Sequence, residues 1–493
     1  MTVLNPLKPS ERMKIPRQHS IEQEAADRVR NFSEVSFGVD EERALTEATR
    51  CLECKNAICI EGCPVSIDIR SFIQLMLQKD YAGAVNKIRE ANYLPAICGR
   101  VCPQEEQCEI VCTLGKKHKP VAIGKLERFV ADYELEHNLF VPPVITEHRE
   151  EKVAIVGSGP AGLTCAAELA KLGYRVTIFE ALHAVGGVLR YGIPEFRLPR
   201  KILDLETDRI RALGVDIQTN FLVGRTATID EFFHEWGFSA VFLGTGAGTP
   251  NFMGIPGESL TGVYSANEFL TRVNLMMANK FPDFDTPIRM GSHVAVIGGG
   301  NTAMDAVRTS KRLGAERALL IYRRSRAEMP ARQEEIHHAE EEGIELLLLT
   351  NPTRILGDDK HSAVGIECQR MELGEPDESG RRKPVPIKGS EFLIPVQIVI
   401  EAVGQQPNPI IQATTSGLKT GKRGVVVTDE KQQTSRPGIF AGGDLARGGA
   451  TVILAMRDGK VAAAAIHDYL TSRRSNLQDT AQPEKKAEEI AAK

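Results

Sequence analysis

The stretch VAIVGSGPAG, residues 153–162, decides the fold of most of this chain. It begins as a short apolar strand, continues into the pattern Gly-x-Gly-x-x-Gly, and is followed by residues with helical periodicity. In such a unit Gly157 permits the tight turn, Gly159 lets the backbone approach a pyrophosphate, and Gly162 lets the helix pack closely on the strand. The sequence therefore predicts a parallel α/β domain whose helix N-terminus faces the phosphates of a dinucleotide.

Residues farther along the chain complete this first site. Arg175–Phe179 is the expected next strand, and Glu180 at its end can accept hydrogen bonds from ribose hydroxyls. The glycine-rich segment 186–194 suits a loop along a flavin ring, and the Gly-Asp pair after the apolar residues 439–441 suits closure over the flavin side chain. A generic glycine turn is the alternative, but it does not account for that late pair. The predicted FAD-binding residues are Gly157, Gly159, Pro160, Ala161, Gly162, Glu180, Gly187, Leu189, Gly443 and Asp444.

A second unit, VAVIGGGNTA at residues 294–303, repeats the pattern with one difference. The strand after it ends in Arg323 and Arg324, where NAD sites usually have an acid. Arginine can hold a 2′-phosphate with two hydrogen bonds, whereas a carboxylate would repel it. The sequence thus favours NADP(H), with a solvated basic turn as the alternative. The predicted residues are Gly298, Gly300, Asn301, Thr302, Arg323 and Arg324.

Eight of the ten cysteines lie between Cys51 and Cys112. They form the runs Cys-x2-Cys-x4-Cys-x3-Cys-Pro and Cys-x3-Cys-Pro-x4-Cys-x3-Cys. Short spacings on a turning backbone bring several thiolates to one iron–sulfur cluster, and Cys-Pro recurs in ferredoxin-type runs. Zinc is the alternative, but it usually takes two Cys-x2-Cys halves, and this chain has one. Iron–sulfur chemistry is therefore predicted.

Composition gives the broad class. The chain has 493 residues, 42% of them hydrophobic, and a net charge of -4, which gives no electrostatic case for nucleic-acid binding. No stretch approaches the ~18 apolar residues of a membrane span, and the first residues lack the apolar run of a signal peptide. A cytoplasmic protein without nucleic-acid or membrane partners is expected.

The motifs divide the chain into an α/β protein with three domains. Residues 1–148 are predicted to form an α-helical iron–sulfur domain. Two interleaved Rossmann-type domains follow, an FAD-binding domain split over 149–250 and 400–470 and an NADP-binding domain over 251–399. Residues 471–493, rich in Ser, Gln, Glu, Lys and Ala, are predicted to be a disordered tail.

In combination these motifs resemble the glutamate synthase small-chain family. The resemblance rests on the cysteine runs, including CGRVCPQ at residues 98–104, on the two glycine motifs, and on IFAGGD at residues 439–444. A similar module occurs in dihydropyrimidine dehydrogenase, in a ferredoxin:NADP oxidoreductase and in sulfide dehydrogenase. No catalytic acid or base is predicted, because the cofactors perform hydride transfer.

The resemblance implies two [4Fe-4S] clusters with crossed ligands. One would take Cys51, Cys54, Cys59 and Cys112, and the other Cys63, Cys102, Cys108 and a non-cysteine ligand, with Glu127 where dihydropyrimidine dehydrogenase has glutamine. Cys98 would be a spare thiol.

The resemblance also implies an enzyme that passes electrons from NADPH through FAD to the clusters and on to a partner in a hetero-oligomer. The expected partner is the large FMN and iron–sulfur subunit of glutamate synthase. The alternative is a ferredoxin-type acceptor, with this chain as the NADP-linked subunit of a ferredoxin:NADP oxidoreductase or a sulfide dehydrogenase. A non-enzymatic assembly or sensor protein is a further alternative, which the intact glycine loops and eight thiols disfavour.

Overall fold

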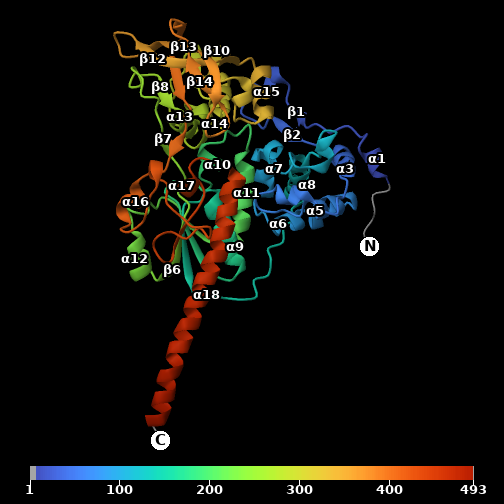
Figure 1. Ribbon diagram of the computed structural model, residues 1–493, viewed down its shortest axis with the longest axis vertical. Helices are drawn as coiled ribbons and strands as arrows, with labels where there is room; N and C mark the ends of the chain where they lie inside the picture. Colours follow the sequence, from blue (N-terminus) through green and yellow to red (C-terminus); the bar gives the residue numbers. More distant parts are fainter. Residues whose placement is uncertain (1–6, 492–493) are drawn as a thin grey trace.

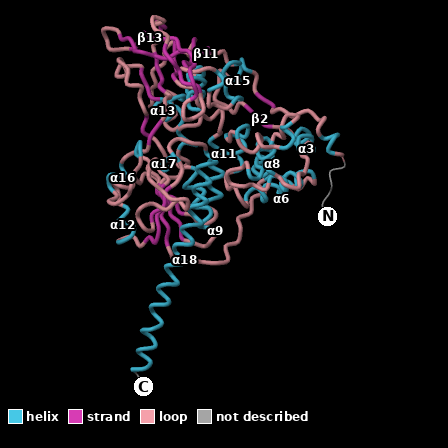
Figure 2. The backbone as a smooth tube through the Cα atoms, in the orientation of Figure 1, coloured by secondary structure: helices cyan, strands magenta, loops and turns pink. Residues whose placement is uncertain are grey.

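The computed structural model describes residues 7–491, with side chains described for residues 7–474. Figure 1 shows a helical N-terminal domain beside a central α/β unit, with a second α/β unit above it and the long helix α18 (Val452–Ala491) running out below. Figure 2 separates the helical N-terminal part from the two regions that contain the sheets. The predicted fold class, a helical domain followed by two Rossmann-type units, is confirmed.

The N-terminal domain consists of short helices around the cysteine loops. Its apolar residues recur at helical spacing, so that Ile69, Phe72, Ile73 and Met76 form one buried face. A short two-stranded sheet, β1 and β2, precedes the main helices. The elements are α1 (Pro9–Arg12), β1 (Ile21–Glu22), α2 (Ala25–Arg28), β2 (Ser36–Gly38), α3 (Glu41–Thr49), α4 (Ile58–Glu61), α5 (Ile69–Leu77), α6 (Tyr81–Arg89), α7 (Pro95–Val101), η1 (Gln104–Glu106), η2 (Thr113–Lys116) and α8 (Ile123–His137).

The first α/β unit contains a parallel sheet with the strand order β18-β6-β3-β4-β5. Four of its strands come from one stretch of chain, and the fifth arrives after the whole second unit, so the unit is split in sequence. Its strands are β3 (Lys152–Val156), β4 (Arg175–Phe179), β5 (Asp216–Gln218), β6 (Phe238–Leu243) and β18 (Ile439–Ala441). Its helices are α9 (Pro160–Lys171), α10 (Val188–Tyr191), α11 (Arg200–Arg211), α12 (Ile229–His234), α16 (Ile410–Thr414), α17 (Asp444–Arg447) and α18.

The second unit contains the parallel sheet β11-β10-β9-β16-β8. The predicted boundary at residue 399 falls inside β16, because Ile398–Glu401 pairs with β9 and β8 of this sheet. Its strands are β8 (Val263–Ser265), β9 (His293–Ile297), β10 (Arg317–Tyr322), β11 (Glu345–Leu348) and β16 (Ile398–Glu401). Its helices are α13 (Ala266–Asn274), α14 (Asn301–Arg312) and α15 (Gln333–Glu341).

Two further sheets complete the fold. The chain passes between the two α/β units twice, and the two connecting segments pair with each other as β7 (Thr249–Pro250) and β17 (Gln405–Gln406). An antiparallel sheet that the sequence did not predict is inserted between β11 and β16. It consists of β12 (Thr350–Gly357), β13 (Ala363–Pro376), β14 (Arg382–Pro386) and β15 (Phe392–Pro395).

Helix α18 continues to Ala491, through most of the segment predicted as a disordered tail. The alanine, glutamate and lysine that make this segment poor at burying apolar surface also have high helix propensity, so composition alone did not separate the two outcomes. The side chains from residue 475 onward and residues 492–493 lie outside the described part. Within that part, every helix is too short or too polar to cross a membrane.

Candidate functional site

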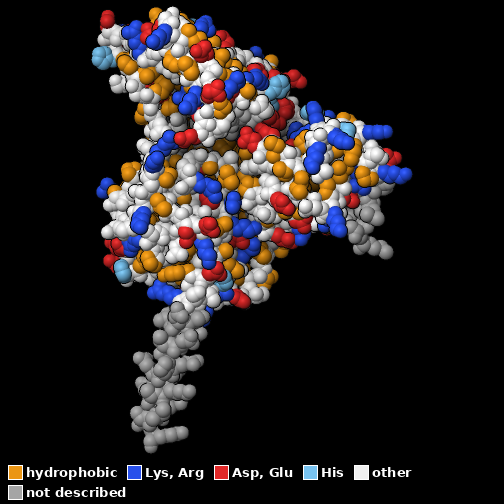
Figure 3. All heavy atoms as spheres, viewed as in Figure 1, with side chains coloured by type: hydrophobic (Ala, Val, Ile, Leu, Met, Phe, Trp, Pro, Cys, Tyr) orange, Lys and Arg blue, Asp and Glu red, His pale blue; other side chains and the backbone are white. Residues whose placement is uncertain are grey.

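A cleft of about 1150 Å³ lies where the three domains meet, and Figure 3 shows the surface hollowed between the upper and central parts. Each domain contributes to its wall. The first unit supplies Pro160, Val188 and Asp444, the second supplies Gly298, Gly300, Thr302 and Arg323, and the N-terminal domain supplies Val101, Pro103 and Glu106. The two glycine loops and the segment after Cys102 therefore border one space.

The first glycine loop has the geometry that a close approach to phosphate needs. Gly157 has φ of +99°, and a Cβ at Gly162 would lie 2.0 Å from the Gly157 carbonyl oxygen. At Gly159, by contrast, a Cβ would meet no atom within 4 Å. Helix α9 begins immediately afterwards with Pro160 in its first turn. The glycines thus close the turn on its inner side and leave its outer side open.

Glu180 is buried beside this loop and organises it. Its carboxylate accepts hydrogen bonds from the backbone N–H of Ser158 at 2.9 Å and of Leu182 at 2.8 Å, and from the Ser158 hydroxyl. These contacts tie the strand end to the turn. That Glu180 contacts a ribose stays a prediction.

Two further predicted loops lie against the first. Gly187 has φ of +53°, and a Cβ there would lie 2.9 Å from the Gly159 Cα. Gly443, with φ of +66°, would bring a Cβ to 3.1 Å from that of Ala161. Leu189 is fully buried in the core next to them, and Asp444 borders the cleft. The structure therefore brings together all the segments that carry the predicted FAD residues.

Asp458 is a positioning residue that the sequence did not reveal. This buried carboxylate of α18 accepts a hydrogen bond from the Gly443 N–H at 3.0 Å and pairs with Arg447. Its neighbour Gly459 lets α18 cross α9, since a Cβ there would lie 2.2 Å from the Ala161 carbonyl oxygen. The Asp-Gly dipeptide was the only signal in the sequence.

The second glycine loop repeats the first in outline. Gly298 has φ of +142°, and the nearest atom to a Cβ at Gly300 would be Pro330 Cγ at 4.0 Å. The side chain of Asn301 accepts a hydrogen bond from the Arg332 N–H at 3.0 Å, which fixes the start of α14, and Thr302 is exposed. The backbone at Gly300 is therefore open to the cleft, as at Gly159.

The structure separates the two predicted arginines. Arg324 is buried, pairs with Asp377 at 2.6 Å and donates to the Arg382 carbonyl at 2.8 Å, so it holds the β13–β14 hairpin. Arg323 is exposed at the edge of the cleft, and no residue in the described part of the chain forms an ion pair with it. Both line the cleft, but only the Arg323 guanidinium is available to a ligand there.

The cysteines form two groups that cross between the two sequence runs. Burial raises the pKa of Cys51 to about 12, with the thiols of Cys59, Cys112 and Cys54 adding to the effect. Burial likewise raises the pKa of Cys63 to about 11, with Glu127 and Cys102 as its neighbours, and raises that of Cys108 with Glu109, Cys63, Glu127 and Cys102 nearby. The first group is therefore Cys51, Cys54, Cys59 and Cys112, and the second is Cys63, Cys102 and Cys108, with both Glu127 and Cys98 beside it.

Glu127 and Cys98 both border the second group. Glu127, on α8, accepts a hydrogen bond from Asn92 at 2.7 Å, and burial raises the pKa of its carboxyl to about 8. Cys98, on α7, is fully buried, and its sulfur lies 3.5 Å from that of Met456. Glu127 as the eighth ligand stays a prediction.

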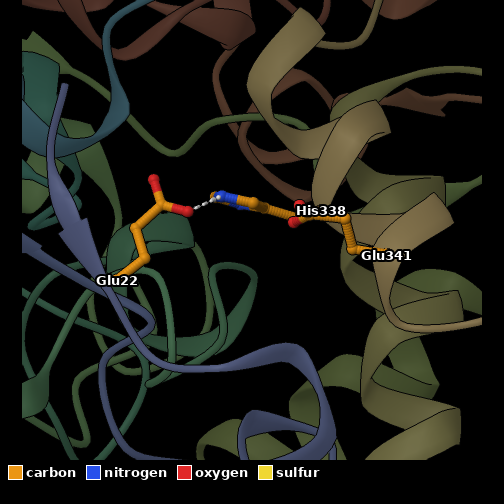
Figure 4. A group of neighbouring side chains, drawn as sticks. All are labelled: Glu22, His338 and Glu341. Atoms are coloured by element: carbon orange, nitrogen blue, oxygen red, sulfur yellow. Dashed lines mark hydrogen bonds and ion pairs between the residues drawn. The ribbon is translucent and has the colours of Figure 1, made fainter.

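The spread of the thiols fits a cluster better than a single ion. In the described residues, one group offers three ligand atoms within 4.8 Å of one another, and it is Glu22, His338 and Glu341 rather than the cysteines. Figure 4 shows Glu22 facing the His338 ring across the contact between β1 and α15. Arg28 donates to Glu341 at 2.7 Å and balances that group's charge.

The cysteine sulfurs are spaced too widely for one zinc ion. Four sulfurs on one zinc ion would be only ~3.8 Å apart, given Zn–S bonds of about 2.3 Å, whereas no three cysteine sulfurs in the described residues lie within 4.8 Å of one another.

Two protein families match this chain, one in the cysteine-rich part and one in the part with the glycine loops. Residues 28–139 match the family described as dihydropyrimidine dehydrogenase domain II, 4Fe-4S cluster, and residues 151–459 match the pyridine nucleotide-disulphide oxidoreductase family. These matches point to 4Fe-4S, FAD and NADP as the cofactors.

Two curated relatives and one solved structure give more detail. The glutamate synthase [NADPH] small chain of Halomonas elongata is 35% identical over 92% of this chain and 97% of its own length. The NADP(+)-dependent formate dehydrogenase subunit beta of Moorella thermoacetica is 41% identical over 84% of this chain, which spans 60% of that subunit's length. FprA of Mycobacterium tuberculosis in complex with NADPH matches 67% of this chain and 86% of its own at a TM-score of 0.57 and 20% identity, which shows the shared fold. The two curated relatives are named as a chain and a subunit, which supports a hetero-oligomer.

Proposed function

Because the chain belongs to the glutamate synthase small-chain family, we propose that it carries electrons from NADPH to two [4Fe-4S] clusters and from there to a partner subunit. It is an NADPH-dependent oxidoreductase of the flavin and iron–sulfur type. Bound FAD would supply the chemistry that links two-electron oxidation of NADPH to one-electron transfer.

The shared cleft is the observation that carries this proposal. Pro160 and Asp444 of the first unit, Gly300 and Arg323 of the second, and Pro103, next to Cys102, all line it. Electron transfer between bound groups needs short distances and fixed orientation, and segments of all three domains border this one cleft.

The chain's own residues have distinct parts in this proposal. The open backbone at Gly159 would admit the FAD pyrophosphate, and Gly443–Asp444, held by Asp458, would close over the flavin side chain. Gly300 would face the NADPH pyrophosphate, and Arg323 would bind its 2′-phosphate.

Burial suggests the order of the two clusters. The thiols of Cys63, Cys102 and Cys108 are buried, and α7, which leads to Cys102, packs on the first unit through the contact of Cys98 with Met456. The four cysteine residues of the other group are all only partly buried. We therefore place the Cys63 group next to the flavin and the Cys51 group toward the partner.

The leading partner is a large FMN and iron–sulfur subunit that makes glutamate. The alternative is a ferredoxin-type acceptor or the catalytic subunit of another NADP-linked enzyme, which the 41% identity to the formate dehydrogenase subunit favours. The cytoplasm is the proposed compartment, because exposed cluster thiols need a reducing environment.

Anaerobic titration of the full-length, cofactor-loaded protein with NADPH and with NADH tests the proposal. Flavin bleaching at much lower NADPH than NADH, with spin-resonance signals from two clusters under strong reductant, is expected. An absence of flavin reduction by either nucleotide would contradict the proposal.

Two cysteine variants test the crossed assignment. Cys112→Ser should remove the signal of the cluster toward the partner, and Cys108→Ser that of the cluster next to the flavin. If the crossing is right, the two variants remove different cluster signals. If each run instead held its own cluster, Cys108 and Cys112 would share one, and both variants would remove the same signal.

A further inference from the structure

A lysine-rich surface lies beside the partly exposed thiol group. Lys55 directly follows Cys54, and Lys116 ends the short η2 helix that begins after Cys112. Five exposed lysines in this region form what we call the lysine face: Lys14, Lys55, Lys116, Lys117 and Lys119.

One buried arginine beneath this face holds two of its backbone segments together. The buried guanidinium of Arg50 donates to the carbonyls of Ile15 at 3.0 Å, Lys119 at 2.6 Å and Pro120 at 3.0 Å. Arg50 is itself paired with Glu47. The segments that carry Lys14 and Lys119 are therefore held side by side by their backbones, while the lysine side chains stay in solvent.

The positive charge of this face is not compensated within the chain. None of the five lysines forms an ion pair in the described part of the structure. Of the nearby acids, Glu53 pairs with Arg12 at 3.3 Å and Glu109 with Arg17 at 2.7 Å, while Glu11, Glu61 and Glu106 are exposed. Figure 3 shows Lys and Arg side chains at the outer end of the N-terminal domain.

One apolar side chain stands among these charges. Ile110 is 66% exposed and lies between Cys108 and Cys112, which belong to different thiol groups. A shallow hollow of about 390 Å³ beside it is lined by Gly115 and Pro120, by the basic Arg17 and Lys119, and by the acidic Glu105 and Glu109. The surface beside the thiols thus offers a small apolar contact next to side chains of both charges.

We propose that the lysine face is the docking site for a small, acidic, one-electron carrier protein. This inference rests on the proposed electron path, and at this face it selects the ferredoxin-type acceptor, given above as the alternative, over the large subunit. Oxidation of one NADPH to NADP⁺ and H⁺ releases two electrons, so each turnover reduces two carrier molecules by one electron each.

The composition of the face favours a transient carrier over a permanent subunit. Permanent interfaces bury more than about 2,000 Å² and are largely apolar, whereas redox encounters bury less than about 1,200 Å². Complementary charge mainly accelerates such encounters. A face with five unpaired lysines and one exposed isoleucine matches the second kind.

The test uses the full-length, cofactor-loaded protein with an acidic [2Fe-2S] ferredoxin as the probe. The variant Lys116→Glu/Lys117→Glu/Lys119→Glu is compared with Lys388→Glu/Lys419→Glu/Lys431→Glu, which makes the same charge change at exposed lysines of the other two domains. Ferredoxin binding is measured by calorimetry and ferredoxin reduction by absorbance at several salt concentrations. NADPH oxidation with menadione, an uncharged small acceptor, reports the nucleotide and flavin steps separately.

At low salt, we expect the lysine-face variant to reduce ferredoxin about 10-fold or more slowly than the wild type, the scale of electrostatic steering. Its affinity for ferredoxin, measured by calorimetry, should fall as well. The difference should shrink as salt shortens the ~10 Å screening length. Menadione activity and cluster signals should stay at the wild-type level. Equal behaviour of the two triple variants, or wild-type ferredoxin binding that is insensitive to salt, would overturn the inference and favour a permanent subunit at this face. If the wild-type protein does not oxidise NADPH with menadione at all, the proposed function itself is wrong.

Discussion

The two nucleotide units have nearly the same strand, glycine loop and helix, but different forces attach them to the N-terminal domain. The first unit shares one continuous hydrophobic core with that domain, in which Phe72 and Leu94 belong to the same cluster as Leu163 and Met456. The second unit has cores of its own. It is joined to the others largely through buried ion pairs such as Arg28 with Glu342 at 2.9 Å and Arg197 with Asp305 at 2.8 Å.

This difference has a functional meaning. Apolar packing over a shared core fixes the first unit against the thiol groups, as a route for electrons requires. Ion pairs depend on geometry and on ionisation, so the second unit is held by contacts that solution conditions can change. The unit proposed to bind the exchanging nucleotide is thus the one attached by the more adjustable contacts.

The largest expected effect separates the two glycine loops. Gly159→Ala should leave the fold intact, because a Cβ there meets no protein atom, yet it should deplete the purified protein of FAD and abolish activity with every acceptor. A methyl group in a close contact costs about 1–3 kcal/mol, or roughly 5- to 150-fold in affinity. Gly300→Ala should raise the KM for NADPH by a similar factor and leave the FAD content unchanged.

Flavin absorbance and steady-state kinetics check both variants. Gly248→Ala serves as the control, since that glycine also has open space around a Cβ but does not line the cleft. Loss of FAD from Gly300→Ala, with Gly159→Ala retaining it, would reverse the assignment of the two units.

A smaller effect distinguishes the two arginines of the second unit. Arg323→Ala should raise the KM for NADPH about 10- to 100-fold, because charge-assisted hydrogen bonds contribute about 1.5–3 kcal/mol. Kinetics with NADH should not change. Arg324→Ala should lower the unfolding temperature, since it removes the pair with Asp377, and should affect the preference for NADPH less. The ratio of kcat/KM for the two nucleotides decides, and a larger change of that ratio in Arg324→Ala would contradict the structure.

The smallest effect on activity is expected from acid, which acts on stability. Burial opposes ionisation of Glu342, but a hydrogen bond from Arg312 and the charge of Arg308 hold its pKa at about 2, below the ordinary 4.5. A depressed pKa stabilises the folded state fully above pH 4.5, and this stability is lost as the pH falls toward 2. The contact of α2 with α15 should therefore loosen in that range before the apolar contact of α7 with α18 does.

Hydrogen exchange read by mass spectrometry at pH 5 and pH 3 measures both contacts. Glu342→Gln should destabilise the protein at pH 7 by about 3–5 kcal/mol, the cost of breaking a buried ion pair, and should remove the acid dependence. If the α7–α18 contact opens at a higher pH than the α2–α15 contact, the comparison between the two units is wrong.

Local pattern was enough to predict much of the molecule. A strand followed by a glycine turn is specified within ten residues, so both loops, the helices after them and the crowding of the cysteines were predictable. The boundary inside β16 was not, because an apolar strand followed by glycine is the same signal in either sheet. The inserted β12–β15 sheet was missed for a related reason, as the segment's polar and proline-rich strands lack a clear alternating pattern.

The sequence by itself determined which chemistry this protein can hold: two phosphate-binding turns and eight clustered thiols, all written in short spacings. Only the tertiary structure decided how these parts combine. It separated Arg323 from Arg324, because the partner of Arg324 lies 53 residues away on the hairpin. It placed Asp458 under Gly443, gave the thiols an inner and an outer group, and left the lysine face unpaired. Such relations depend on distances between segments remote in sequence, which no local pattern encodes.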